Sequence, residues 1–134
     1  MTIWERSMTA KEVQDYLKDY LLNIQGDIFY MNALRRYVTK YEPFMHNTQI
    51  HGLCLHYYDQ IRSARAQLDK KRVRMMKWAE LISDPVHRQI FVDRYINAMQ
   101  WEDIQIKYSY CPSSIFRIHN KCCAEIAKKL RERN

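Results

Sequence analysis

Apolar residues in the first 82 positions recur at helical spacing and predict two long amphipathic helices. The first carries an apolar residue at every third or fourth position, at Val13, Leu17, Tyr20, Ile24, Ile28, Met31, Leu34, Val38 and Tyr41. Thr9 and Glu12 have the spacing of a capping box, which predicts that this helix begins there after a disordered lead over residues 1–8. Glu42-Pro43 predicts its end, and Gly26 leaves open a break midway.

The second helix is expected to follow a connector over residues 43–51. Its apolar face is interrupted at Arg72 and consists of Cys54, Tyr57, Ile61, Ala64, Leu68, Met75, Ala79 and Ile82. Two such helices joined by a short linker should fold back as an antiparallel hairpin. Because a two-helix hairpin buries little apolar surface by itself, we expect a third helix or a second copy of the chain to cover it, and hence a homo-oligomer.

The last third of the chain predicts three shorter helices. Ser83-Asp84-Pro85 is a helix start with an N-cap aspartate, and it predicts a helix over 86–97. The core face of that helix is expected to hold Ile90, Phe91, Tyr95 and Met99.

A short helix with Trp101, Ile104 and Tyr108 on one face should come next, then a tight turn of about three residues and a longer helix with Pro112 at its first position. The core stripe of this longer helix is Ile115, Ile118, Cys122, Ile126 and Leu130. This order predicts a helix-turn-helix. The fold class is therefore all-α, with a helical hairpin over residues 1–82 and a three-helix module over residues 83–134.

Composition and charge agree with this fold and suggest a polyanionic partner. Only 2 Gly and 3 Pro in 134 residues leave little material for a turn-rich fold, and 47% apolar residues suffice for a core. The net charge is +7, and the basic residues are clustered. One block is Arg62, Arg65, Lys70, Lys71, Arg72, Arg74 and Lys77; the other is Arg117, Lys121, Lys128, Lys129, Arg131 and Arg133. The alternative interpretation is that these blocks are solvated helix faces.

The four cysteines form no C-x-x-C pair, so we expect reduced thiols. Cys122 and Cys123 are adjacent on one helix, and we expect that they do not both point inward. No stretch approaches the roughly 20 apolar residues that span a bilayer, which predicts a soluble, cytoplasmic protein without membrane contact.

A family resemblance rests on Arg94-Tyr95-Ile96 with Trp101-Glu102-Asp103-Ile104, followed by Ile115-Phe116-Arg117-Ile118-His119. These residues resemble the ArpU/RinA-type phage transcriptional regulators, whose C-terminal half is similar to the promoter-reading region four of sigma-70-family factors. Three positions depart from the family pattern. Ala98 and Ser109 replace glycines at the two turns, and Gln105 replaces a small alanine. Ser109 is therefore expected to adopt a left-handed conformation.

The resemblance implies a phage late-gene activator that binds promoter double-stranded DNA in the bacterial host cell, together with host RNA polymerase. The second helix of the motif would enter the major groove. Its expected DNA-contacting residues are Ser113, Ser114, Phe116, Arg117, Asn120, Lys121, Lys128 and Lys129. Arg117 is the candidate for a guanine contact and Phe116 for a thymine methyl, while the lysines would attract phosphates.

Other chemistries are less well supported by the sequence. His46, His51, Cys54 and His56 could supply zinc ligands, but their spacing matches no familiar module. His119 and Cys122 could face each other, yet a third orienting group is missing. No cofactor motif or enzyme signature is present, so we expect no enzyme activity. The alternative function is a helical interaction factor, binding polymerase or acting in assembly, whose helix-turn-helix does not read DNA.

Overall fold

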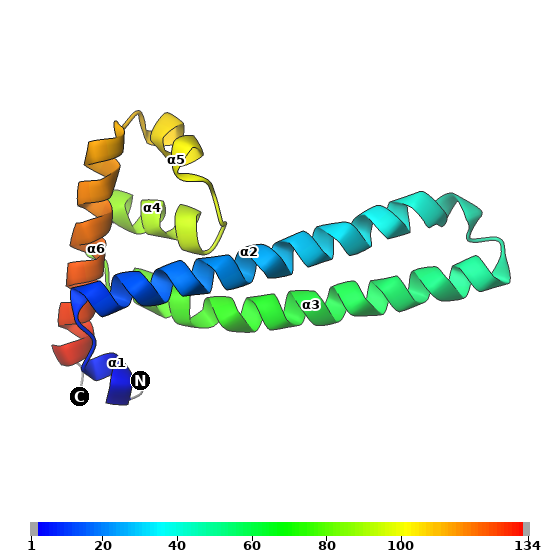
Figure 1. Cartoon of the computed structure of the whole chain (residues 1–134), viewed down its shortest axis with the longest axis horizontal. Coiled ribbons are helices and arrows are strands. Elements are labelled where there is room, and N and C mark those ends of the chain that lie inside the picture. The colour runs from blue at the N-terminus through cyan, green and yellow to red at the C-terminus, as the bar shows by residue number, and fades with distance from the viewer. Residues whose placement is uncertain (1–2, 133–134) are drawn as a thin grey trace. The chain divides into compact units, whose positions relative to one another are not determined.

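The computed structural model describes residues 3–132, which contain six α-helices, one 3-10 turn and no strand (Figure 1). The predicted all-α class is confirmed. The elements in order are α1 (Ile3–Arg6), α2 (Ala10–Tyr41), η1 (Glu42–Phe44), α3 (Thr48–Glu80), α4 (Pro85–Tyr95), α5 (Trp101–Tyr108) and α6 (Pro112–Glu132).

The chain divides into two compact units whose boundaries cut both long helices. Unit 1 comprises residues 1–21 and 72–134, and unit 2 comprises residues 22–71. The division expected from the sequence lay between residues 82 and 83. The last part of α3 instead belongs to the same unit as α4, α5 and α6, because its apolar side chains contribute to that unit's core.

Within unit 2, α2 and α3 run side by side in opposite directions (Figure 1). Lys71 Nζ lies 2.7 Å from both Asp27 Oδ2 and Asn23 Oδ1, and the rings of Tyr37 and Tyr57 stack 5.5 Å apart. The buried apolar side chains of this unit are Ile24, Met31, Leu34, Val38, Cys54 and Leu68. All six belong to the two stripes that the sequence predicts.

The ends of the two long helices follow from local chemistry. As predicted, α2 ends before Pro43, and it runs through Gly26 without a break. In contrast, α3 begins at Thr48, inside the expected connector. The Asn47 carboxamide oxygen accepts hydrogen bonds from the backbone N–H groups of Gln49 and Ile50, at 3.0 and 3.2 Å, and so caps the helix earlier than the apolar pattern indicates.

The segment before α2 is ordered where the structure describes it, so the expected disordered lead is wrong for residues 3–8; Met1 and Thr2 lie outside the described residues. Glu5 is buried, 3.4 Å from Trp78 Nε1 and 3.5 Å from Arg74 Nε. Met8 is buried too. These contacts join residues far apart in the sequence, so the local pattern contains no sign of them.

Unit 1 is built around apolar side chains from all of its longer helices. Val13 and Leu17 of α2, and Met75 and Trp78 of α3, are almost completely buried. Asp84 begins α4 as predicted, its carboxylate accepting from the backbone N–H groups of Val86 and His87. These hydrogen bonds, with that of His87 the largest influence, hold the pKa of Asp84 below its usual value. Within the described residues, no helix has both the length and the apolar character needed to cross a bilayer.

The capping box at the start of α2 gives a first prediction. The Thr9 hydroxyl oxygen accepts from the N–H of Glu12 at 3.2 Å, and the Glu12 carboxylate accepts from the N–H of Thr9 at 3.5 Å. Thr9→Ala should lower the free energy of unfolding by about 1 kcal/mol, since it leaves a helix-end N–H group without its acceptor. Thr39→Ala, an exposed threonine inside the same helix, is the matched control and should change stability by less than about 0.5 kcal/mol. Urea denaturation measures both, and equal effects would contradict the prediction.

Candidate nucleic-acid interface

The turn between α5 and α6 fixes the angle at which the candidate recognition helix leaves its neighbour. Ser109 has φ 57° and ψ 38°, the left-handed conformation predicted for it. Its N–H donates to the carbonyl oxygen of Ile106 at 3.3 Å, and that of Tyr110 donates to Gln105 at 3.1 Å. This pair of bonds is a Schellman motif, which normally uses glycine at the position of Ser109.

Ala98, before α5, also has a positive φ, of 56°. The N–H of Met99 donates to the carbonyl oxygen of Asp93 at 2.9 Å, and Arg94 Nη1 donates to that of Met99 at 2.9 Å. These bonds hold the link between α4 and α5 in place despite the cost of a left-handed alanine. Both non-glycine turn residues therefore keep the backbone conformation that glycine favours.

A buried carboxylate joins α4 to α5. Asp93 is 1% exposed, and its two oxygens accept from Tyr108 Oη at 2.6 Å, Lys107 Nζ at 2.9 Å and Gln89 Nε2 at 3.0 Å. Burial raises the pKa of Asp93, but the hydrogen bonds from Tyr108, Lys107 and Gln89 lower it more, so the net pKa lies below its usual value. The sequence analysis did not single out Asp93, because nothing local distinguishes it from a surface acid.

The buried face of α6 is wider than predicted. The five residues of the predicted stripe are buried, and so are Cys123 and Ala127. The expectation that Cys122 and Cys123 do not both point inward is therefore wrong. Neighbours cover α6 over a broad arc: Cys122 Sγ lies 3.9 Å from the carbonyl oxygen of His87 in α4. Cys123 Sγ lies within 4.0 Å of the ring of His119, one turn earlier on α6, and that ring in turn contacts Tyr95 of α4. Burial raises the pKa of both thiols to about 12.

His119 belongs to a buried cluster rather than to a reactive pair. Its Nε2 shares a hydrogen bond of 2.5 Å with Tyr95 Oη, and its ring makes a T-shaped contact with Trp101 at 5.3 Å between centroids. Burial, together with the charge of Arg94, lowers the pKa of His119 to about 4. Its neighbouring thiol is Cys123, not the expected Cys122, and at pH 7 both groups are neutral. This arrangement does not activate a nucleophile.

Trp101, on the face of α5 that it was predicted to share with Ile104 and Tyr108, is half-buried. The Arg94 guanidinium lies over its ring, 4.6 Å from the centroid.

The outward face of α6 carries three exposed cations and an exposed aromatic ring. Arg117, Lys121 and Lys128 follow each other at i, i+4 and i+11, which places them on one side of the helix. Phe116, beside Arg117, is 67% exposed. These four residues are available to a partner as the sequence predicts.

The other expected contact residues have partners within unit 1. The hydroxyls of Ser113 and Ser114 both lie 3.2 Å from Cys111 Sγ, and the Asn120 carboxamide oxygen accepts from Gln14 Nε2 at 2.9 Å. Those serine hydrogen bonds lower the pKa of the exposed Cys111 thiol to about 6. A bidentate contact of Asn120 with adenine would require it to give up Gln14.

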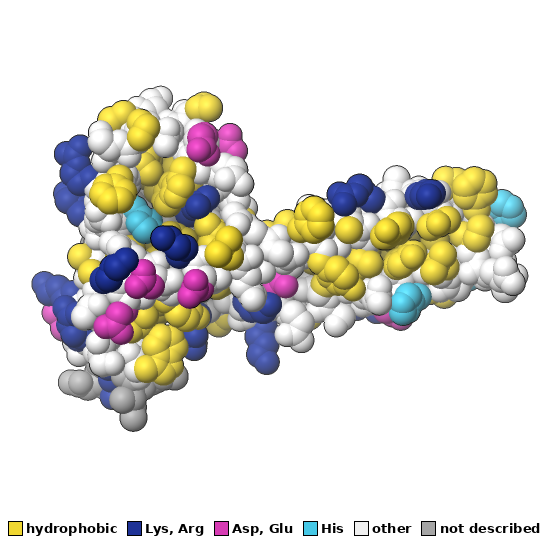
Figure 2. All heavy atoms as spheres, in the orientation of Figure 1, with side chains coloured by type: hydrophobic (Ala, Val, Ile, Leu, Met, Phe, Trp, Pro, Cys, Tyr) yellow, Lys and Arg dark blue, Asp and Glu magenta, His cyan; other side chains and the backbone are white. Residues whose placement is uncertain are grey.

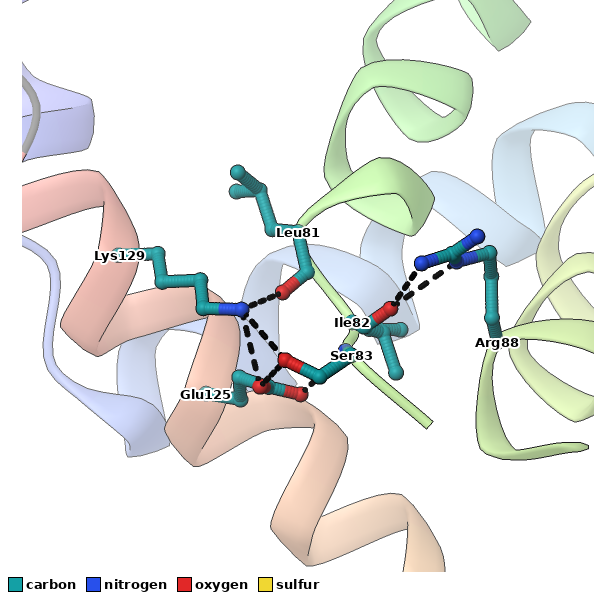
Figure 3. A network of polar contacts seen from close by, with 6 residues as sticks. All are labelled: Leu81, Ile82, Ser83, Arg88, Glu125 and Lys129. Carbon is teal, nitrogen blue, oxygen red and sulfur yellow. Dashed lines mark hydrogen bonds and ion pairs between the residues drawn. The ribbon is translucent and has the colours of Figure 1, made fainter. Parts of the chain in front are cut away.

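Lys129 joins α6 to the segment that follows α3. Its ammonium donates to the carbonyl oxygen of Leu81 at 2.8 Å and to Ser83 Oγ at 2.7 Å, and it pairs with Glu125 at 3.0 Å (Figure 3). Glu125 in turn accepts from the backbone N–H and the hydroxyl of Ser83. These contacts hold α6 against the chain that leaves α3, so Lys129 is not part of the exposed cationic face.

Much of the remaining basic charge is also engaged. Arg74 lies over the rings of Trp4 and Tyr16 and donates to Tyr16 Oη at 2.7 Å. Arg131 Nη1 donates to the carbonyl oxygen of Met8 at 3.2 Å. Arg133 lies outside the described residues. The first basic block is therefore not a continuous cationic stripe, because Lys71 and Arg62 also pair with acids.

The suggested zinc ligands are not assembled into a site. Cys54 is completely buried, whereas His46, His51 and His56 are exposed. Over residues 3–132, no three His, Cys, Asp or Glu side chains are grouped so that they could hold a metal ion.

Comparison of the chain with known protein families, curated proteins and solved structures gives no significant match. The site is therefore interpreted from its own geometry.

The strained turn gives a second prediction. Ser109→Gly should raise the free energy of unfolding by about 0.5–1 kcal/mol, because relief of the left-handed strain exceeds the extra entropy of glycine in the unfolded chain. Ser63→Gly, on the exposed face of α3, should lower it by about 1 kcal/mol. Thermal and urea denaturation measure both, and destabilisation by Ser109→Gly would contradict the observed conformation.

The Asp93 network predicts a pH dependence. Because the folded-state pKa is lowered, the ionised carboxylate stabilises the fold at pH values above its unfolded pKa of about 3.9, and this contribution is lost as the pH falls through the folded pKa. Asp93→Asn should cost about 2 kcal/mol at pH 7, and the difference from wild type should shrink below about pH 3. Asp103→Asn, an exposed acid of α5, is the control and should have little effect. Urea titrations between pH 7 and pH 3 test this, and a pH-independent difference would contradict it.

Proposed function

We propose that this protein is a sequence-specific, double-stranded-DNA-binding transcription regulator, in which α4, α5 and α6 form a helix-turn-helix module and α6 enters the major groove. The observation that supports this most is the division of α6 into two faces. One face is apolar and buried, while the other presents Arg117, Lys121 and Lys128 to solvent. A helix held rigidly from behind, with cations on its outer side, suits a polyanionic groove.

The positions along α6 assign different tasks to these residues. At 1.5 Å per residue, Arg117 and Lys128 are about 16 Å apart along the helix axis. Arg117 and Phe116 lie near the N-terminal end, which in this motif contacts the base edges, and there Arg117 would pair with guanine and Phe116 with a thymine methyl. Lys121 and Lys128 would contact phosphates and contribute affinity without sequence preference.

The rest of the module supports this arrangement. The Schellman turn at Ser109 and the Asp93 network fix α5 and its neighbours behind the proposed reading helix. We leave Lys129 out of the DNA-contacting residues that the sequence predicts, because its ammonium donates to the carbonyl oxygen of Leu81, just after α3. Ser113, Ser114 and Asn120 would contribute only after giving up their contacts within the chain.

The resemblance to ArpU/RinA-type regulators extends the proposal to phage late-gene activation in a bacterial host. Glu102 and Asp103 are exposed in the first turn of α5, where the helix dipole also favours acids. In this proposal they present an acidic surface to host RNA polymerase while α6 is on promoter DNA. Activation then occurs by recruitment.

A DNA-binding measurement tests the proposal directly. A random duplex pool is enriched on the full-length protein, and the selected duplex is titrated by fluorescence anisotropy at several salt concentrations. Affinity should fall steeply with log salt, since each neutralised phosphate releases counterions. Arg117→Ala should cost about 1–3 kcal/mol on the selected duplex and relax the base preference at one position. Lys128→Ala should weaken all duplexes alike and reduce the salt slope by about one.

Arg65→Ala is the control for loss of charge, since Arg65 is an exposed arginine of α3 outside the module. It should leave both affinity and salt slope nearly unchanged. Absence of binding at low salt, or binding that Arg117→Ala and Lys128→Ala do not alter, would contradict the proposal. Such a result would favour the alternative of a helical interaction factor that does not read DNA.

A further inference from the structure

Helix α2 carries a second apolar stripe that is largely exposed, and its last member, Tyr37, also stacks on the ring of Tyr57 in α3. Its members recur at spacings of four, three, four and four residues: Leu22, Gly26, Phe29, Ala33 and Tyr37, with Tyr30 beside them. Phe29 is 70% exposed, Leu22 65%, and Tyr30 and Tyr37 49% each. The buried stripe of the same helix segment is Ile24, Met31, Leu34 and Val38. Between Leu22 and Tyr37, this helix therefore carries two apolar stripes, one buried and one largely exposed.

Gly26, within the exposed stripe, indicates what kind of element could cover it. A Cβ atom placed on Gly26 would meet nothing within 4 Å, so packing within the chain does not explain a glycine there. Glycine inside a helix is destabilising relative to alanine. Its benefit is close approach of another backbone, and Ala33 provides a second small residue two turns further on. Small residues flanked by large apolar ones suit a helix crossing at short distance.

The exposed area is large for a segment with so small a core. With aromatic side chains of roughly 150–250 Å² each, the stripe exposes on the order of 400–500 Å² of apolar surface. The largest apolar patch of a typical monomer covers about 300–600 Å² and is often functional, and a standard interface buries about 800 Å² on each partner, so the stripe would supply roughly half of one. Figure 2 shows hydrophobic side chains exposed along this part of the molecule. Unit 2 buries only six apolar side chains of its own.

The order of residues along the stripe points to a second copy of the chain. Reversing the stripe about its midpoint, between Phe29 and Tyr30, places Leu22 opposite Tyr37 and Gly26 opposite Ala33. Large residues then meet large ones, Leu22 with Tyr37 at each end and Phe29 with Tyr30 at the centre, and Gly26 meets Ala33 on either side of the centre. A self-complementary surface of this kind is what a two-fold symmetric dimer requires.

Charge along the same helix fits the same alignment. Asp19 precedes Leu22 by three residues and Lys40 follows Tyr37 by three, and both are exposed. In the reversed alignment, the Asp19 of one chain lies opposite the Lys40 of the other. An antiparallel pair thus gains two ion pairs, whereas a parallel pair would place like charges together.

We propose that this face of α2, from Leu22 to Tyr37, binds the same face of α2 in a second copy in antiparallel orientation. The proposal does not rest on DNA binding, because it concerns the protein alone. It replaces the general expectation of an oligomer with one particular surface, the largely exposed stripe of α2.

Sedimentation equilibrium of the full-length protein tests this proposal. Wild type should be a concentration-dependent dimer. Phe29→Glu should raise the dimer dissociation constant at least tenfold while circular dichroism shows unchanged helix content, since Phe29 is mostly exposed in the single chain. Ile106→Glu is the matched control, because Ile106 of α5 is 78% exposed, and it should leave the dimer intact.

A charge exchange tests the orientation. Lys40→Asp should weaken the dimer, and Asp19→Lys in the same chain should restore it. A wild-type protein that stays monomeric at high micromolar concentration would overturn the proposal, as would a dimer that Phe29→Glu leaves unchanged. Failure of the double exchange to restore association would overturn the antiparallel alignment. None of these results depends on whether the protein binds DNA.

Discussion

The buried carboxylate of Asp93 is the interaction on which the geometry of the C-terminal module depends. It accepts hydrogen bonds from Tyr108 and Lys107 of α5 and from Gln89 of its own helix, and its backbone carbonyl accepts from Met99 in the intervening link. A carboxylate this deeply buried is costly unless its lone pairs are satisfied. The same bonds that offset the burial cost also determine where α5 lies against α4, and α6 follows after a three-residue turn.

The turns before and after α5 each contain a non-glycine residue in a strained, left-handed conformation. Ala98 and Ser109 both adopt left-handed conformations that favour glycine. At Ser109 the conformation is held by the backbone hydrogen bonds of Ser109 and Tyr110 to α5. At Ala98 it is held by the hydrogen bond of the Met99 N–H to Asp93 and by that of Arg94 to the Met99 carbonyl oxygen. Surrounding hydrogen bonds can therefore hold a left-handed turn even where the residue is not glycine.

Several basic residues that form clusters in the sequence are engaged in contacts within the folded chain. Lys129, Arg74 and Lys71 all look like surface cations in the sequence, yet each is engaged with carbonyl, aromatic or carboxylate groups of the same unit. The exposed cations of α6 form a narrower set than the sequence suggests. Net charge thus gives only the excess of basic residues, whereas the placement of each side chain shows which cations are free to meet a partner.

The sequence by itself determined the features that depend on near neighbours along the chain. The all-α class, the Thr9 capping box, the Asp84 start of α4 and the buried stripe of α6 all follow from spacing and local backbone chemistry. The left-handed Ser109 was expected from the family resemblance, which has a turn glycine at that position. Tertiary structure decided what depends on contacts between distant residues. The order of α1 comes from the contact of Glu5 with Trp78. The simultaneous burial of Cys122 and Cys123 comes from packing on more than one side of α6. The role of Lys129 comes from carbonyl and hydroxyl groups more than forty positions earlier in the chain. Periodicity reports which side of a helix is apolar, but it cannot report how much of that helix its neighbours cover, because those neighbours are brought together only by the fold.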